Sequence, residues 1–177
     1  MRAIRLICIL AIFAALTAAT VSVMAERGDD SDRVSKNGKT EGTIDGVQVT
    51  LEYGRPNVKG RTIWGELVPY GKVWRTGANE ASTITFSDDV TIEGEPLAAG
   101  TYGLFTLPGE ESWVVIFNKT AAQWGAFNYE SGEDALRVEV APGMGEQVES
   151  MDFVIEGSQV VLRWEKLTVG FEVAKAS

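Results

Sequence analysis

The sequence predicts a single all-β domain, a jelly-roll-like β-sandwich of about ten short strands, behind an N-terminal signal peptide. Three observations support this prediction. Short segments of alternating apolar and polar residues recur along the chain, and no segment beyond the leader keeps a helical apolar period over several turns. Glycine is abundant, with 19 residues in a chain of 177, which suits turns between strands. The first residues have the charge and hydropathy order of an export signal.

Residues 1–25 are predicted to be a cleaved secretory signal peptide. Arg2 and Arg5 give the segment a positive start, and an apolar core follows from Leu6 to Leu16. Residues 6–25 are also just long enough to span a bilayer, so an uncleaved membrane anchor stays open as the alternative. The expected location is outside the cytoplasm, either periplasmic or extracellular.

The composition excludes several kinds of site from the chain beyond the leader. Cys8 is the only cysteine and lies within the leader, and the chain has no histidine. Disulfides, Cys/His zinc sites, cysteine nucleophiles and Ser-His-Asp triads are therefore excluded. We predict no cofactor, no metal site and no catalytic residue. A pair of carboxylates, as in glycoside hydrolysis, is the remaining catalytic route. The candidates for it are Glu66, Glu80, Glu130, Glu133 and Asp134.

Residues 26–43 are predicted to be a disordered linker, and residues 44–174 to form the folded domain. The linker is highly charged and has one aliphatic residue, Val34. From Val47 to Tyr53 apolar and polar side chains alternate, which predicts the first strand. Residues 54–71 break this alternation with four glycines and two prolines, which indicates a long irregular loop.

Further strands are predicted along the rest of the domain, with a second irregular loop at residues 119–134. Turn residues bound the strand segments, and Gly157-Ser158 and Glu165-Lys166 are expected to be tight turns in a closing meander. Trp113 and Trp164 follow strand patterns and are predicted to be core residues. The remaining predicted strands are 72–76, 82–86, 89–93, 100–106, 113–118, 135–141, 150–155, 159–164 and 167–173.

The chain is acidic overall, but the charge is reversed in the first loop. The formal net charge is −9, and it becomes −11 when Arg2 and Arg5 leave with the leader. This charge disfavours nucleic acid and anionic membrane surfaces, so membrane contact is expected only through an uncleaved leader. Residues 55–75 nevertheless carry a net charge of +4.

The candidate ligand-binding residues lie in the two irregular loops and the strand starts beside them. Arginine forks fit carboxylates, phosphates or sulfates, unless they pair with the protein's own carboxylates. Loop aromatics can stack on sugars or aromatic ligands, or they can fill the open ends of the sandwich. Asn79 and Glu80 either form a polar turn or face the same opening as Trp74 and Arg75. The full set is Arg55, Lys59, Arg61, Trp64, Lys72, Trp74, Arg75, Asn79, Glu80, Trp124, Asn128 and Tyr129.

The run YGRPNVKGRTIWGELVPYGKVWRTGANEASTITF, residues 53–86, resembles a bacterial family of exported domains of unknown function, DUF2911. The segments LAAGTYGLFTLPG, WVVIFNK, QWGAFNY and DALRVEV extend the resemblance to about residues 44–173. The resemblance implies export and the extent of the domain. It implies no activity, cofactor or site residue.

The leading hypothesis is a non-catalytic exported domain that binds a small anionic or carbohydrate-like ligand where the two loops meet. The alternatives are a structural or protein-interaction module of the cell envelope, with an unknown protein partner, and a carboxylate-dependent hydrolase. Half-exposed Trp74 and Trp124 beside unpaired arginines would favour binding. Buried tryptophans, with Arg75 paired to Glu80, would favour the structural module.

Overall fold

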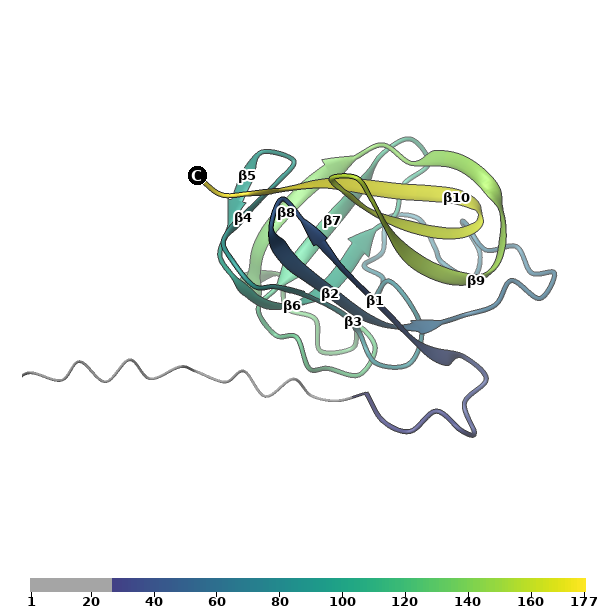
Figure 1. Ribbon diagram of the computed structural model, residues 1–177. Coiled ribbons are helices and arrows are strands. Elements are labelled where there is room, and N and C mark those ends of the chain that lie inside the picture. Colours follow the sequence, from purple (N-terminus) through teal and green to yellow (C-terminus); the bar gives the residue numbers. More distant parts are fainter. Residues whose placement is uncertain (1–26) are drawn as a thin grey trace, which may run out of the picture.

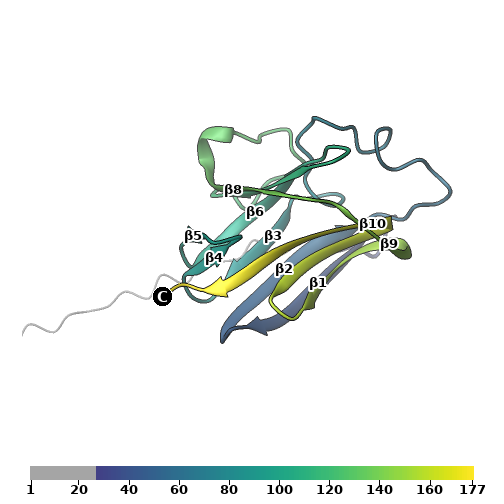
Figure 2. The ribbon, with the colours of Figure 1, turned by 90° about the horizontal axis from the view of Figure 1, so that it is seen from above.

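The structure is a computed structural model that describes residues 27–177, which form two antiparallel β-sheets (Figures 1 and 2). The predicted signal peptide lies outside the described residues. Within residues 27–177 no helix is long and apolar enough to cross a membrane. The predicted all-β sandwich is confirmed, and the two sheets do not close into a barrel.

The larger sheet has six strands in the order β1-β2-β3-β6-β7-β8. Its neighbours along the sheet pair antiparallel throughout. The strands are β1 (Lys36–Ile44), β2 (Val47–Arg55), β3 (Ser82–Phe86), β6 (Gly100–Leu107), β7 (Trp113–Asn118) and β8 (Asp134–Val140).

The smaller sheet has four strands in the order β5-β4-β10-β9, dominated by a long twisted hairpin (Figure 1). The hairpin consists of β9 (Gly143–Glu156) and β10 (Gln159–Lys175). The short strand β4 (Val90–Ile92) pairs with the C-terminal end of β10, and β5 (Glu95–Leu97) pairs with β4. A 3-10 turn, η1 (Ser131–Glu133), precedes β8.

The core lies between the sheets and follows from the period-two patterns. In β2 the inward set Val47, Val49 and Leu51 is fully buried, and each such side chain stabilises the fold by about 1.5–3 kcal/mol. Trp113 of β7 and Trp164 of β10 are also fully buried, which confirms both as core residues.

The prediction of a disordered linker over residues 26–43 is wrong from Lys36 onward, because β1 begins there. β1 pairs with β2 in continuous register from Lys36↔Arg55 to Ile44↔Val47. The strand lacks an alternating apolar pattern because it is an edge strand held by backbone pairing and by polar contacts. The Thr40 hydroxyl, for example, donates to the carbonyl of Phe153 in β9 at 2.8 Å.

Two other strand predictions also need correction. Residues 72–76 form no strand, and only Trp74 makes an isolated bridge, with Thr106 of β6. The expected turn at Glu165-Lys166 is absent, because β10 runs through it with register shifts on both sides of Glu165. Glu165 has a φ of 57°, so the polar dipeptide Glu165-Lys166 marks an irregularity inside the strand and not a turn.

Candidate functional site

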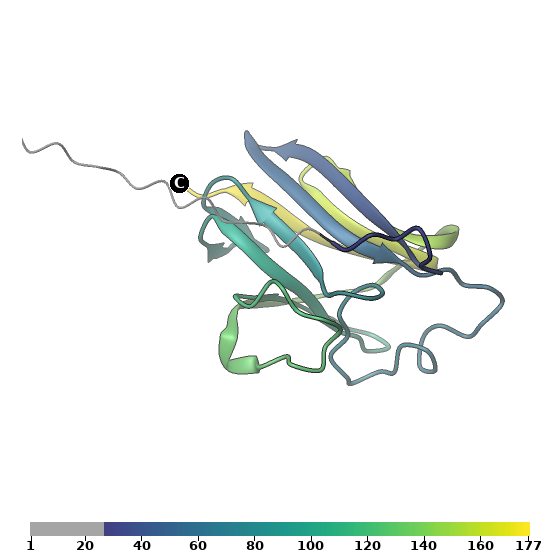
Figure 3. The same cartoon turned by 90° about the horizontal axis from the view of Figure 1, so that it is seen from below.

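A cavity of about 420 Å³ lies where the first loop closes over one end of the sandwich. The loop leaves β2 and is tied to β9 at its start, where Met151 N–H donates to the Pro56 carbonyl at 2.9 Å. It is tied to β6 near its end, where Trp74 and Thr106 exchange backbone hydrogen bonds of 2.8 and 2.9 Å. Figure 3 shows this loop as the long connection between β2 and β3. We call this cavity the basic pocket.

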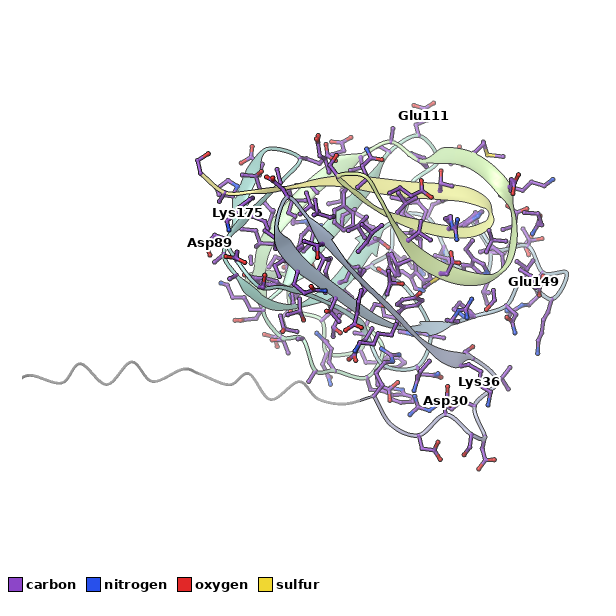
Figure 4. All side chains as sticks on the ribbon, viewed as in Figure 1. Asp30, Lys36, Asp89, Glu111, Glu149 and Lys175 are labelled. Atoms are coloured by element: carbon purple, nitrogen blue, oxygen red, sulfur yellow. The ribbon has the colours of Figure 1, made fainter. Side chains whose placement is uncertain are left out.

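The basic pocket is lined by three cationic side chains and by no carboxylate. Arg61 is exposed, and its guanidinium donates to the carbonyls of Asn57 and Val58. Lys59 is also exposed. Glu149, labelled in Figure 4, accepts a hydrogen bond of 2.9 Å from the backbone N–H of Lys59 and does not itself line the pocket. The third cation is Arg75.

Arg75 is half-buried and has no charged or hydrogen-bonding partner for its side chain within residues 27–177. Its Nε is fully buried without an acceptor. Burial lowers the pKa of Arg75, and no carboxylate among residues 27–177 raises it again. A buried donor left unsatisfied costs about 1–3 kcal/mol, so this arrangement is unfavourable for folding alone.

The floor of the basic pocket is aromatic. Trp64, Trp74, Trp113 and Trp164 form a cluster in which contacting rings have centroids 5.2–6.5 Å apart. Trp74 and Trp164 are stacked and both line the pocket, and Trp74 is only 9% exposed. The Trp74 indole N–H donates to the Gly77 carbonyl at 3.2 Å, whereas the buried Nε1 atoms of the other three have no partner among the described residues.

A family model described as a protein of unknown function, DUF2911, matches residues 35–173, which is most of the chain. The chain belongs to the DUF2911 family. The match begins near the start of β1 rather than at residue 44, in agreement with the corrected start of this DUF2911 domain. Neither the curated proteins nor the solved structures yield a match.

In this DUF2911 domain Glu80 pairs with two arginines from the N-terminal segment and not with Arg75. Arg33 makes a bidentate contact with the Glu80 carboxylate at 2.7 and 2.8 Å. Arg27 adds a contact of 3.3 Å and donates to the carbonyls of Ala78 and Ala81, both at 3.0 Å. Burial raises the pKa of Glu80, but the hydrogen bonds from Arg33 and the two positive charges outweigh it, so the net shift is downward. We call these three residues the Glu80 clamp.

Sequence reasoning missed Arg27 and Arg33 because both lie in the predicted linker. The clamp fixes the N-terminal segment across the first loop, and Val34 and Ser35 thereby become part of the wall of the basic pocket. Asn79, with a φ of 64°, donates from its side chain to the Ser35 carbonyl at 3.1 Å. Asn79 and Glu80 therefore organise the pocket wall without lining it.

The two irregular loops contact each other, but the second loop does not contribute to the basic pocket. Gly125 N–H donates to the Asn79 carbonyl at 3.1 Å, and Ala81 N–H donates to the Gln123 carbonyl at 2.9 Å. Trp124 is 55% exposed, and its ring lies under the guanidinium of Arg33 at 5.8 Å. The two loops run side by side in Figure 3.

Tyr129 belongs to a separate polar cluster around Asp134. The Tyr129 hydroxyl donates to Asp134 at 2.7 Å, and Asn118 donates to the same carboxylate at 2.8 Å. Burial, followed by the hydrogen bond and charge of Asp134, raises the pKa of Tyr129 to about 12. This cluster supports the second loop.

Of the twelve residues proposed from the sequence, four line the basic pocket: Lys59, Arg61, Trp74 and Arg75. Trp64 lies in the aromatic cluster beside it. Arg55 donates instead to the Met151 carbonyl at 3.1 Å, and Lys72 and Asn128 are exposed elsewhere. None of the five carboxylates considered for hydrolysis lines this pocket. The lining residues that sequence reasoning missed are Val34, Ser35, Pro56, Asn57, Leu67, Val68, Gly77, Ala78 and Trp164.

Proposed function

We propose that this domain is an exported, non-catalytic module that binds a small anionic ligand in the basic pocket. The observation that carries the proposal is the half-buried Arg75 guanidinium, which lines a cavity without a carboxylate and has no hydrogen-bond or ion-pair partner among residues 27–177. An oxyanion provides what this side chain lacks, because carboxylate, phosphate and sulfate oxygens match the guanidinium fork. Lys59 and Arg61 at the same cavity add attraction for negative charge.

The geometry favours an anion over a neutral sugar. Sugar recognition typically uses an open aromatic face, whereas Trp74 and Trp164 are buried in their own cluster. The exposed tryptophan, Trp124, lies outside the basic pocket. A carbohydrate would therefore be recognised through a carboxylate or sulfate group.

The alternative of a purely structural module accounts for the tryptophan cluster and the Glu80 clamp, but not for Arg75. A structural arginine is normally held by carboxylates or carbonyls, as Arg27 and Arg33 are here. The hydrolase alternative gains nothing from the basic pocket, since its lining residues include no Asp or Glu.

A thermal-shift screen of the purified protein tests the proposal. The panel holds phosphate, sulfate, small carboxylic acids, and sulfated and neutral sugars at constant ionic strength, which keeps general screening equal. The variants are Arg75→Met and, as a matched control, Lys72→Met, which removes an exposed cation of the same loop outside the pocket.

An anion at about a hundred times its Kd is expected to stabilise the wild type by about 2.7 kcal/mol and raise its Tm by several degrees. Lys72→Met should keep this shift and Arg75→Met should lose it. Equal shifts in all three proteins, or no shift with any anion, would contradict the proposal.

A further inference from the structure

We infer that the ligand of the basic pocket is an amphiphilic organic anion, in which one carboxylate, sulfonate or phosphate group is joined to an aryl or alkyl group. This inference rests on the proposed function and specifies the class of ligand. The anionic group is assigned to Arg75, and the apolar group to the hydrophobic part of the lining.

The first support is the exposure of apolar side chains at this pocket. The described residues expose five large apolar side chains, and two of them, Val34 at 74% and Leu67 at 44%, line the basic pocket. They come from different segments, the N-terminal segment and the first loop. An inorganic anion would make no use of these side chains, whereas an aryl or alkyl group would remove them from water.

The second support is the composition of the inner wall. Pro56, Val68 and Trp164 are buried residues that line the same cavity as Arg75. A cavity of about 420 Å³ lies within the range of small-molecule sites and far exceeds the size of a phosphate or sulfate ion. Sites of this kind are mostly apolar, with a few polar groups that fix orientation.

The third support is the position of the charge. Arg27 and Arg33 pair with Glu80 outside the pocket. The positive charge in the pocket therefore comes from its lining residues Arg75, Lys59 and Arg61. Arg75 is the half-buried member, and the other two are exposed. A ligand with its anionic group at Arg75 therefore places the rest of the molecule against the cavity wall.

Isothermal titration calorimetry with matched ligand pairs tests the inference. The organic anions are phenylacetate and hexanoate, their neutral counterparts are phenylacetamide and hexanamide, and acetate and phosphate are the anions without an apolar group. The proteins are wild type, Arg75→Met, Leu67→Ser and Met144→Ser. The last variant is the control for Leu67→Ser, because Met144 is 80% exposed and lies outside this pocket.

At least one organic anion is expected to bind tenfold or more tightly than acetate, phosphate and its own amide. Leu67→Ser should weaken that anion several-fold, Arg75→Met should abolish its binding, and Met144→Ser should change nothing. Binding of acetate or phosphate as tight as that of both organic anions, lost in Arg75→Met, would overturn this inference and leave the proposed function standing. No Arg75-dependent binding of any anion would overturn both.

Discussion

Replacing Arg75 with methionine is expected to leave the free protein as stable as the wild type, or more stable. The Arg75 side chain makes no hydrogen bond or ion pair with residues 27–177, so the substitution removes no partner. Methionine retains an unbranched apolar stem in a pocket lining that also includes Trp74 and Trp164. Removing the buried Nε–H, which has no acceptor among residues 27–177, should contribute about 1 kcal/mol, at the low end for an unsatisfied group because the side chain as a whole is half-exposed.

The assay is urea unfolding followed by tryptophan fluorescence, since the buried cluster reports on loss of tertiary structure. For a domain of this size about 1 kcal/mol corresponds to a rise in Tm of about 3 °C. The slope of the free energy of unfolding against urea should not change. Arg163→Met is the matched control, because Arg163 makes a bidentate contact with Asp152 at 3.0 and 2.9 Å and its loss should destabilise by about 1 kcal/mol. If Arg75→Met destabilises the protein by as much as Arg163→Met, the account of Arg75 as a binding residue is refuted.

Four further outcomes follow from the structure and the sequence. Glu80→Gln should destabilise by about 1–3 kcal/mol, because Arg27 and Arg33 lose a carboxylate, and a urea titration checks it. The pKa of Glu80 is lowered, so its stabilisation is complete above its unfolded pKa of about 4.3 and is lost as pH falls through the folded pKa. The acid limb of stability against pH should therefore be flatter in Glu80→Gln than in the wild type, and parallel limbs would contradict this. Tyr129 has a raised pKa of about 12, so its contribution is complete below pH of about 10 and is lost as pH rises toward 12. Tyr129→Phe should remove that alkaline loss, which unfolding curves between these pH values measure. Phe127→Ser, at a side chain that is 86% exposed, should change the free energy of unfolding by less than about 0.5 kcal/mol. Mass spectrometry of the protein isolated from the cells that produce it should find a new N-terminus near residue 26, and an intact leader would support the anchor instead.

The fold class was predictable from sequence because several strands, such as β2 and β3, bury every second residue. Val47, Val49 and Leu51 in β2 illustrate this, since all three face the core. β1 was not predictable from an apolar alternation, because its sequence KNGKTEGTI has none and the strand is held by backbone pairing with β2. The prediction of two separate strands, 159–164 and 167–173, in place of β10 was wrong because a register shift at Glu165 leaves polar residues in mid-strand.

The location of the candidate site was partly predictable, but its electrostatics were not. The cluster of cations in an acidic chain pointed to the first loop, and Lys59, Arg61 and Arg75 do line one cavity. Glu80 is not available to Arg75 because Arg27 and Arg33 pair with it instead. Arg27 and Arg33 lie some fifty residues away in sequence, at separations of 53 and 47, so local spacing carries no information on these pairs.

Residues at the back of the pocket were missed for a similar reason. Trp164 was correctly predicted as a core residue. The strand pattern around it did not indicate that its side chain also lines the basic pocket. Leu67 and Val34 carry no periodic signal, because their segments are irregular. Only the folded arrangement brings these side chains to the same cavity as Arg75.

The most direct test of the central claim is a proton–nitrogen NMR spectrum of arginine Nε–H and tryptophan Nε1–H groups during titration with phenylacetate and hexanoate. The Arg75 signal is assigned by its absence from Arg75→Met, and Trp164 is assigned through Trp164→Phe. The account predicts saturable shifts of the Arg75 and Trp164 signals with at least one of the two acids, while Arg163, already bonded to Asp152, and Trp124, outside the pocket, stay in place. An unchanged Arg75 signal with both acids, or equal shifts at Arg75 and Arg163, would contradict the claim that Arg75 holds the anion.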